Sequence, residues 1–262
     1  MATVRRVHHP GPLVENTETE LSADASGHLV RVLRLAAGAR IILFDGAGLE
    51  APAVISEADP RRTLVRVGPV SVGRSESPLE IVLVQGLSRG ARMELVVQKA
   101  TELGVSAIAP AFCARSVVRL DAGRARRRVS HWRQVAAAAC EQSGRSRIPD
   151  ILEPKPLEEA LRFRDGYPGL VLDPLAESGL EGVSGPADGL RLVVGPEGGL
   201  TEAEIAGACV AGCRRIGLGP RTLRTETAAL AALAIVGFAW GDLGPGTGAC
   251  GGPDGQRPTE RR

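Results

Sequence analysis

Residues 190–204, LRLVVGPEGGLTEAE, decide how the second half of the chain folds. The apolar run Leu190–Val194 has the length of a buried strand, and it leads directly into the glycine-rich turn Gly195–Gly199. Thr201 and Glu204 have the spacing of a capping box, which predicts that a helix begins there. A strand, a sharp turn and a helix in this order are typical of an α/β domain with a parallel sheet.

The glycine-rich turn allows two interpretations. Gly198 and Gly199 let the main chain turn sharply and let a ligand come close to backbone N–H and C=O groups. In open α/β sheets, ligands bind beyond the carboxyl ends of the strands, where this turn lies. The residues taken alone fit a ligand site and a plain structural turn equally well.

The same alternation of strands and helices extends over residues 75–241, which we expect to form one α/β domain. Buried strands are predicted at Leu79–Val84, Val105–Ala109, Gly169–Leu172, Leu190–Val194 and Arg214–Leu218. Helices are predicted from Met93 to Leu103, from His131 to Ser143, from Pro156, and after each of the last two strands. The apolar run Ala228–Trp240 is too short for a membrane span and is expected to be a buried helix.

The first part of the chain has β character instead. Short strands are predicted at Leu29–Val30, Arg40–Phe44, Ala53–Ile55 and Thr63–Val67, with turn formers between them. This spacing favours a small barrel or sandwich over residues 1–74. The polar segment Arg74–Pro78 marks the expected domain boundary, and the Gly-, Pro- and charge-rich residues 242–262 are expected to be a disordered tail.

Composition narrows the function classes. Five cysteines without a Cys-x-x-Cys motif make a metal site or a disulfide framework unexpected. The first residues carry charge but no apolar stretch, so no signal peptide and no membrane association are expected, and we predict a cytoplasmic location. The sequence contains no Gly-x-Ser-x-Gly nucleophile elbow and no Walker loop. No dinucleotide-binding Gly-x-Gly-x-x-Gly follows the first strand of the α/β domain.

Three further segments contain candidate functional residues. Thr225-Glu226-Thr227 would cap the last helix, or border a ligand site. Lys99 and Glu102 are three residues apart and are therefore neighbours on one helix face. They could contribute to a functional site, or they could form an ordinary ion pair on a solvated helix face. Residues 111–147, which include Glu141–Arg145, contain nine Arg against two acidic residues, a pattern that fits either phosphate binding or an exposed helix face.

Taken together and in order, these segments resemble the RsmE family of 16S rRNA uracil-N3 methyltransferases, which belongs to the SPOUT class. The resemblance covers roughly residues 4–240 and rests on four segments. They are Gln98–Val105 (QKATELGV), Glu141–Arg145 (EQSGR), Gly195–Gly199 (GPEGG) and Leu218–Ala228 (LGPRTLRTETA). One departure is that many relatives have a Lys in the segment before Gly-x-Arg-Met, where this chain reads Leu87-Ser88-Arg89-Gly90-Ala91-Arg92-Met93; Arg89 can carry that charge.

The resemblance implies a PUA-like β-barrel at the N-terminus and a C-terminal SPOUT domain with a trefoil knot, a homodimer, and S-adenosylmethionine bound in the knot. The metal-free reaction would modify a uridine of 16S rRNA in the small (30S) ribosomal subunit. The implied cofactor contacts are Leu172, Val194, Gly195, Pro196, Glu197, Gly198, Gly199, Leu218, Gly219, Leu223, Arg224, Thr225, Thr227 and Ala228. The residues expected to face RNA are Arg5, Arg6, Arg31, Arg34, Arg89, Lys99, Glu102, Arg115, Arg133, Gln142 and Arg145.

Methylation at N3 requires removal of the imide proton of uridine, so a general base or a nearby cation is expected. Glu226 is the predicted base and Arg224 the predicted stabiliser of the uridine anion, because both border the implied cofactor loop. Glu102 and Lys99 are second choices, and Glu197 is expected to shape the turn.

Three other functions fit parts of the pattern. A SPOUT enzyme with another target, such as a ribose hydroxyl or a tRNA base, would keep the cofactor loops but not Gln98–Val105 and Glu141–Arg145. A non-catalytic RNA-binding or assembly factor would not need the intact loops Gly195–Gly199 and Arg224–Ala228. A phosphate-binding metabolic enzyme would be expected to have a phosphate-loop Lys, which this turn lacks.

Overall fold

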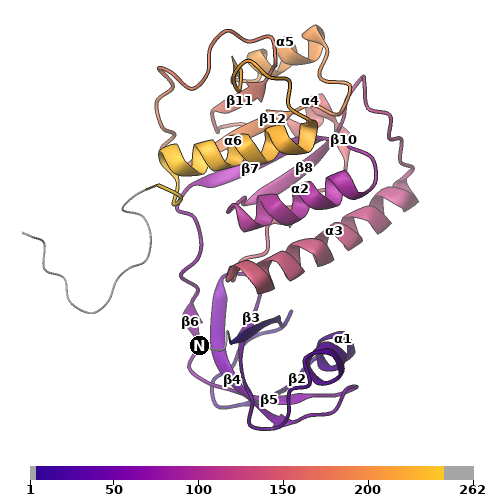
Figure 1. The fold of residues 1–262 in the computed structure, drawn as a ribbon, viewed down its shortest axis with the longest axis vertical. Helices are drawn as coiled ribbons and strands as arrows, with labels where there is room; N and C mark the ends of the chain where they lie inside the picture. The colour runs from indigo at the N-terminus through magenta and orange to yellow at the C-terminus, as the bar shows by residue number, and fades with distance from the viewer. Residues whose placement is uncertain (1–3, 245–262) are drawn as a thin grey trace, which may run out of the picture.

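The computed structural model describes residues 4–244, and the part of the predicted tail from residue 245 onward lies outside them. Within this range the chain forms two sheets of different kinds, one above the other in Figure 1. The lower sheet is mixed and comes from the N-terminal residues. The upper sheet is parallel and is flanked by helices.

The N-terminal sheet consists of six strands in the described part of the chain, in the order β1-β3-β4-β5-β2 with β6 beside β4. They are β1 (Arg5–His8), β2 (Glu18–Glu20), β3 (Arg40–Phe44), β4 (Leu49–Glu57), β5 (Leu64–Val67) and β6 (Ser71–Val72). Buried and exposed residues alternate along β4, so that Ala51, Ala53 and Ile55 point into one core. Three of the four strands predicted here are thereby confirmed.

The fourth predicted strand, Leu29–Val30, is wrong. These residues lie in a π-helical turn, His28–Val32, which continues α1 (Ala23–Gly27). The Ser22 hydroxyl accepts a hydrogen bond from the Ala25 N–H and starts α1, and Leu29 then packs into the core from the helical turn. Two consecutive apolar residues are too short a run to distinguish the periods of helix and strand.

The C-terminal sheet has seven strands among residues 4–244, all paired in parallel. They are β7 (Glu80–Gly86), β8 (Ala107–Phe112), β9 (Asp150–Ile151), β10 (Lys155–Pro156), β11 (Gly169–Leu172), β12 (Gly189–Val194) and β13 (Cys213–Ile216). The order is β10-β8-β7-β12-β11-β13, with β9 beside β8. Because β12 lies between β7 and β11, the carboxyl ends of strands far apart in sequence meet at one edge.

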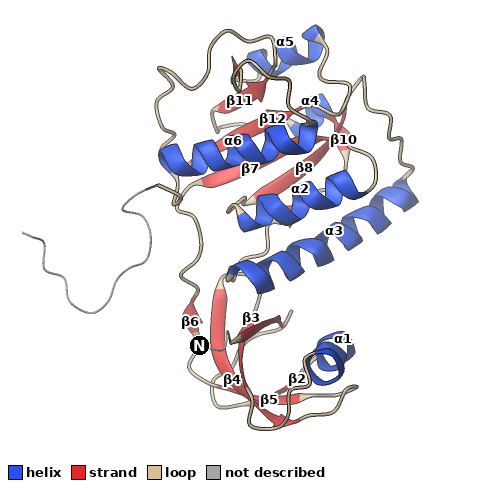
Figure 2. Ribbon diagram, in the orientation of Figure 1, coloured by secondary structure: helices blue, strands red, loops and turns tan. Residues whose placement is uncertain are grey.

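Helices cover both faces of this sheet, as Figure 2 shows. One core contains side chains of α2 (Ala91–Glu102), α3 (Ala122–Ser143) and α6 (Thr225–Trp240) packed on Ile81 and Leu83. The other contains those of α4 (Leu157–Ala160) and α5 (Glu202–Val210) packed on Val82 and Val84. The side chains of β7 alternate between the two cores, which explains why its sequence is a continuous apolar run.

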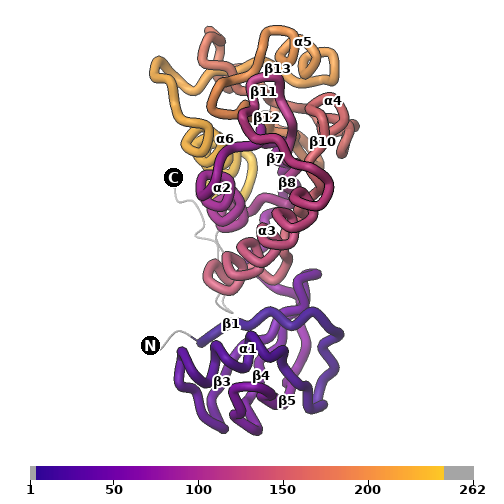
Figure 3. The backbone as a smooth tube through the Cα atoms, turned by 90° about the vertical axis from the view of Figure 1, so that its right-hand side faces the viewer, coloured from indigo at the N-terminus to yellow at the C-terminus, as the bar shows by residue number. Residues whose placement is uncertain are grey.

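Helix α3 begins at Ala122, earlier than the predicted start near His131. The Asp121 side chain caps it by accepting a hydrogen bond from the Arg124 N–H. Its first two turns are rich in arginine and have no apolar stripe, so periodicity could not locate them. The far end of α3 lies next to the N-terminal sheet in the view of Figure 3.

The two sheets are joined by hydrogen bonds at the end of α3. The Glu141 carboxylate accepts a hydrogen bond of 3.0 Å from the His8 N–H of β1. Burial raises the pKa of Glu141, against the lowering effect of that hydrogen bond. Arg6 donates to Glu50 (2.9 Å), to the Ser146 hydroxyl (2.8 Å) and to the Arg145 carbonyl (3.1 Å). The segment Glu141–Arg145 therefore attaches one domain to the other.

Arg145, which was expected to face RNA, is buried, with 4% of its side chain exposed. Its guanidinium donates to the carbonyls of Thr101 and Val105 (2.8 and 2.9 Å) and to the Glu76 carboxylate (2.8 Å). Because these bonds use its donors inside the protein, Arg145 is not available to a phosphate. The expectation of an RNA contact at Arg145 is therefore corrected to a structural role.

We predict that Arg145→Leu lowers the free energy of unfolding by about 3–5 kcal/mol, because it leaves the Glu76 carboxylate and two carbonyls without their partner. Urea unfolding monitored by circular dichroism measures the difference. The matched control is Arg62→Leu, whose pair with Glu20 is 65% and 56% exposed, and which should cost about 1 kcal/mol or less. Equal losses in the two variants would contradict the structural role of Arg145.

Candidate active site

A cavity of about 730 Å³ opens at the carboxyl edge of the parallel sheet. Its walls come from the segments that follow β11, β12 and β13 and from the start of α6, and Arg92 of α2 and Arg115 also line it. Such a volume is that of a site for a drug-sized ligand. Its apolar wall contains Leu172, Leu175, Val194, Leu200, Ile205, Leu218 and Leu223.

The turn after β12 is seated directly against the end of β7. A Cβ atom at Gly86 would overlap the Pro196 nitrogen and lie 2.8 Å from the Gly195 carbonyl carbon. Gly199 has φ +70°, a conformation that side-chain-bearing residues rarely adopt. The close contact with the turn therefore requires glycine at position 86, and the main-chain conformation favours glycine at position 199. Gly199 also lines the cavity.

A buried hydrogen-bond chain connects β7, the turn and α6. The Gln85 amide donates to the Thr225 hydroxyl (2.9 Å), which donates to the Gly195 carbonyl (2.6 Å). Gln85 is fully buried, and sequence reasoning missed it. The signal was present, because a lone amide directly after the apolar run Ile81–Val84 of β7 needs a buried partner.

Arg92, in the first turn of α2, lies between two carboxylates of the cavity. Its guanidinium is 2.9 Å from Glu197 Oε1 and 4.0 Å from Glu226 Oε1. The Arg89 N–H donates to the same oxygen of Glu197 at 3.0 Å. Sequence reasoning did not identify Arg92, since only the fold brings residues 92, 197 and 226 together.

The carboxylates of Glu197 and Glu226 differ in the hydrogen-bond donors that they have. Partial burial disfavours the charge of Glu197, but hydrogen bonds from Arg89, from its own N–H and from Arg92 outweigh it and lower the pKa. Glu226 has 12% of its side chain exposed, and its buried Oε2 has no hydrogen-bond partner within residues 4–244. A buried carboxylate oxygen without a donor is costly, so a ligand that supplies one would be stabilised here.

A third acidic residue, Asp173, follows β11 directly and lines the cavity. Its carboxylate accepts hydrogen bonds from the Leu175 N–H (3.0 Å) and from Arg215, and Arg215 also pairs with Glu202 at 2.8 Å. This chain of charges ties the loop after β11 to β13 and to the start of α5. Asp173 was not predicted from the sequence, although a carboxylate just beyond a buried strand was a signal.

Of the residues expected to contact a cofactor, all but Thr227 line the cavity, as do the predicted catalytic residues Glu226 and Arg224. Thr227 instead points outward on α6. The second-choice pair, Lys99 and Glu102, hold each other at 2.9 Å in the last turn of α2. They lie 7 and 10 residues beyond Arg92, roughly 10 and 15 Å along the helix, and the fold does not bring them to the cavity.

The residues expected to face RNA are spread over several surfaces. Arg5, Arg31, Arg34 and Gln142 are exposed near the N-terminal sheet or the end of α3. Arg133 is exposed and donates to the Ile151 carbonyl. Arg6 is engaged in the junction between the domains, so its guanidinium is not free. Arg115 lines the cavity and donates to the carbonyls of Gly198 and Leu200.

Three of the cysteines are buried in environments that disfavour a reactive thiolate. Cys113, Cys140 and Cys213 are buried, and burial raises the pKa of Cys113 and of Cys140 to about 12. Cys209 is exposed, and Cys250 lies outside the described residues. Among residues 4–244, no group of three or more His, Cys, Asp and Glu side chains has the arrangement of a metal site. No helix in that range is long and apolar enough to cross a membrane.

Comparison with known proteins gives two matches to domain families. Residues 75–237 match the RNA methyltransferase domain family, and residues 21–67 match the RNA methyltransferase PUA domain family. Among curated proteins, the chain is 34% identical to ribosomal RNA small subunit methyltransferase E of Bacillus subtilis, over 80% of this chain and 86% of that protein. It is 35% identical to the Mycobacterium bovis protein of the same name, over 83% and 85%.

Solved structures agree with these matches. Ribosomal RNA small subunit methyltransferase E from Neisseria gonorrhoeae, bound to S-adenosyl methionine, superposes with a TM-score of 0.85 at 35% identity, covering 92% of this chain and 99% of that one. A Legionella pneumophila protein in complex with the same cofactor gives 0.88 at 36%, covering 92% and 100%. The predicted fold class, a SPOUT parallel-sheet domain with a PUA-like domain before it, is confirmed.

We predict that Gly86→Ala displaces the Gly195–Pro196 turn and lowers the free energy of unfolding by about 1–3 kcal/mol, because the added methyl has no room. Chemical denaturation gives the value. The control is Gly207→Ala in α5, where no atom lies within 4 Å of the new Cβ, and this change should stabilise by about 0.5–1 kcal/mol. If Gly86→Ala is as stable as the native protein, the close seating of the turn is wrong.

Proposed function

The chain belongs to the RNA methyltransferase family that includes ribosomal RNA small subunit methyltransferase E, and from this we propose its reaction. It transfers a methyl group from S-adenosylmethionine to N3 of one uridine in 16S rRNA of the small ribosomal subunit. The observation that carries the proposal is the cavity at the carboxyl edge, in which a Glu226 oxygen without a partner in the described chain lies among the loops that the sequence predicted to bind the cofactor.

The residues of the cavity fit S-adenosylmethionine. Leu172, Leu218 and Leu223 give apolar walls suited to a purine ring, and the glycine-rich turn exposes backbone donors and acceptors for its edge. The carboxylates of Asp173 and Glu197 are paired with Arg215 and Arg92, so Glu226, whose buried Oε2 has no donor within residues 4–244, is the carboxylate placed to attract the positive charge of the cofactor. When bound there, the cofactor supplies an electrophilic methyl group on a positively charged sulfur.

The chain's own residues supply the proton transfer and the positioning. Glu226 is the candidate base, since its Oε2 is buried, has no donor in the described chain and can accept the N3 proton. Arg92, 4.0 Å from the other oxygen of Glu226, holds that carboxylate at the cavity wall. Arg224 precedes α6, lines the cavity and forms no salt bridge within residues 4–244, so its guanidinium can stabilise the uridine anion.

The target base must be reached in RNA, whose A-form helices hide base edges in a deep and narrow groove. We expect a uridine in a loop or a strained junction that turns out of the RNA into the cavity. The PUA-like domain and the exposed arginines would hold the RNA backbone while the base is in place. A protein acting on ribosomal subunits would work in the cytoplasm.

We also propose that the enzyme is a homodimer, supported by the outer face of α6. Ile235 and Phe238 are 43% and 62% exposed on this helix, and Leu243 just after it is 45% exposed. Exposed large apolar side chains clustered on one helix face mark a surface that another protein surface covers. A second copy of α6 would bury them in a symmetric contact.

The experiment offers purified enzyme and labelled S-adenosylmethionine to small ribosomal subunits that lack the modification, followed by nucleoside analysis. We expect 3-methyluridine at one site. Glu226→Gln should lower the single-turnover rate by about 10²- to 10⁴-fold, because an amide cannot accept the proton. Its affinity for the cofactor, measured by calorimetry, should stay close to that of the native protein.

Three outcomes would contradict these assignments separately. Full turnover by Glu226→Gln would remove Glu226 as the base but leave the reaction intact. Absence of labelled product with the native enzyme, despite cofactor binding, would mean that another RNA is the substrate. Absence of cofactor binding would favour a non-catalytic RNA-binding protein.

We predict that Ile235→Glu combined with Phe238→Glu shifts the enzyme from dimer to monomer in sedimentation velocity, because each copy would bury two like charges in the contact. The control is Val210→Glu at the end of α5, where the side chain is 91% exposed and a charge should leave the dimer intact. A native protein that sediments as a monomer at all concentrations would exclude the dimer.

A further inference from the structure

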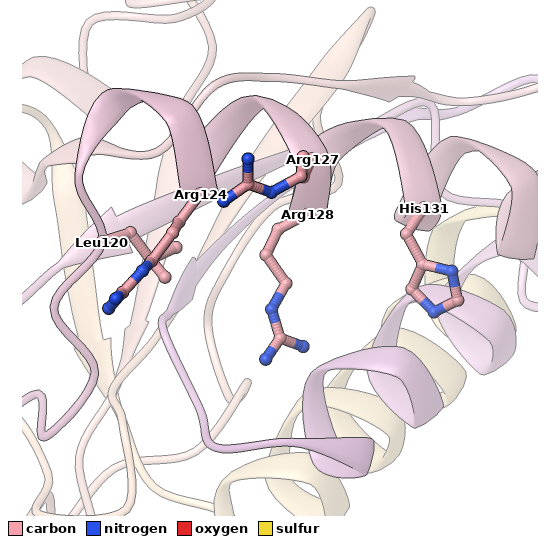
Figure 4. A pocket seen from close by; sticks show the side chains of 5 residues that line it. All are labelled: Leu120, Arg124, Arg127, Arg128 and His131. Atoms are coloured by element: carbon pink, nitrogen blue, oxygen red, sulfur yellow. The ribbon is translucent and has the colours of Figure 1, made fainter.

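The first turns of α3 form a second hollow, distinct from the cavity described above. Its volume is about 470 Å³, and Leu120, Arg124, Arg127, Arg128 and His131 line it. We call it the α3 arginine hollow. The residues recur at helical spacing, and in Figure 4 Arg128 and His131 extend from α3 toward α2.

The positive charge of the hollow is only partly neutralised. Arg124 is 3.3 Å from Asp121, whose other oxygen already accepts the capping hydrogen bond from the Arg124 N–H. The carboxylate of Glu94, on α2, is shared between Arg128 (3.8 Å) and His131 (3.4 Å). Arg127 forms no salt bridge within residues 4–244. Three guanidinium groups thus face two carboxylates, so an anion would stabilise the cluster.

The hollow lies at the same edge of the sheet as the cavity, because α2 and α3 both begin after the carboxyl ends of their strands. Two connections join the sites. The loop from β8 to α3 places Arg115 on the carbonyls of Gly198 and Leu200 in the cavity and then reaches Leu120 in the hollow. The first turns of α2 place Arg92 on Glu197 in the cavity and Glu94 on Arg128 in the hollow.

The chemistry of the hollow fits the backbone of RNA. Guanidinium groups bind phosphate oxygens in pairs of parallel hydrogen bonds, and the half-exposed side chains here are accessible to a large ligand. No Phe, Tyr or Trp side chain lines it, His131 is its one ring, and Leu120 is its apolar residue. These features favour contacts to phosphates and sugars over the reading of bases.

We propose that the α3 arginine hollow binds phosphates of the RNA strand next to the nucleotide that enters the cavity. The proposal rests on the proposed function, since it takes RNA as the substrate. It assigns Arg124, Arg127 and Arg128 a role in holding the substrate. The reaction itself takes place in the neighbouring cavity.

The test compares the full-length enzyme with Arg124→Gln/Arg127→Gln, in binding to a labelled single-stranded RNA oligonucleotide at several salt concentrations. Each phosphate contact to a single strand contributes about 0.7 to the slope of log affinity against log salt. The double variant should therefore flatten the slope by about 1.4 and bind more weakly at low salt. Its affinity for S-adenosylmethionine and its unfolding midpoint should stay unchanged.

The matched control is Arg162→Gln/Arg164→Gln, which removes the same charge from an exposed surface beyond α4. It should keep the native slope. The proposal is overturned if both double variants flatten the slope equally, or if Arg124→Gln/Arg127→Gln keeps the native slope. In either case, methylation of subunits by the native enzyme would still support the proposed reaction. If the native enzyme neither binds the oligonucleotide nor methylates subunits, the proposed function fails, and this inference fails with it.

Discussion

The seating of β12 between β7 and β11 is the constraint on which the site depends. It brings the turn Gly195–Gly199 against the end of β7, where Gly86 leaves room only for a hydrogen atom. The Gln85–Thr225–Gly195 hydrogen bonds then fix the start of α6 relative to this turn. Three loops from distant parts of the sequence thereby enclose one cavity, and a strand order that separated β7 from β12 would form none.

Buried polar groups connect the parts of the fold, because each must find its partners in another element. Arg191 is fully buried and donates to the carbonyls of Leu161, Tyr167 and Ala211, which ties β12 to segments before and after it. Arg145 does the same for the end of α2 and the connector between the domains. Burying such a charged side chain without its partners costs free energy of folding. These residues therefore favour the one packing arrangement that pairs them over arrangements that would only bury the apolar side chains.

The balance of charge differs between the two hollows at the carboxyl edge. The cavity is lined by four carboxylates and four guanidinium groups, those of Asp173, Glu197, Glu202 and Glu226 and of Arg92, Arg115, Arg221 and Arg224. Excess arginine charge lies beside it, in the α3 arginine hollow, where a polyanion fits. Arg92 and Arg115 lie at the boundary and pair with the turn, through the Glu197 carboxylate and the Gly198 and Leu200 carbonyls.

Sequence patterns predicted correctly the strands and helices whose apolar period is long or whose ends carry clear caps, such as β12 and the helix α5 that the Thr201–Glu204 capping box begins. It also determined the family, through motifs in order, and most of the cavity wall. It was wrong about Leu29–Val30 and late for the start of α3, since neither has enough apolar residues to set a period. Three placements became visible only in the folded chain: Glu141–Arg145 joins the domains, Arg92 lies between Glu197 and Glu226, and Lys99 and Glu102 lie away from the cavity. Periodicity and capping act between residues a few positions apart, whereas Arg92 lies 134 positions from Glu226 and Arg6 lies 139 positions from Arg145, so these partners meet only when the sheets have formed.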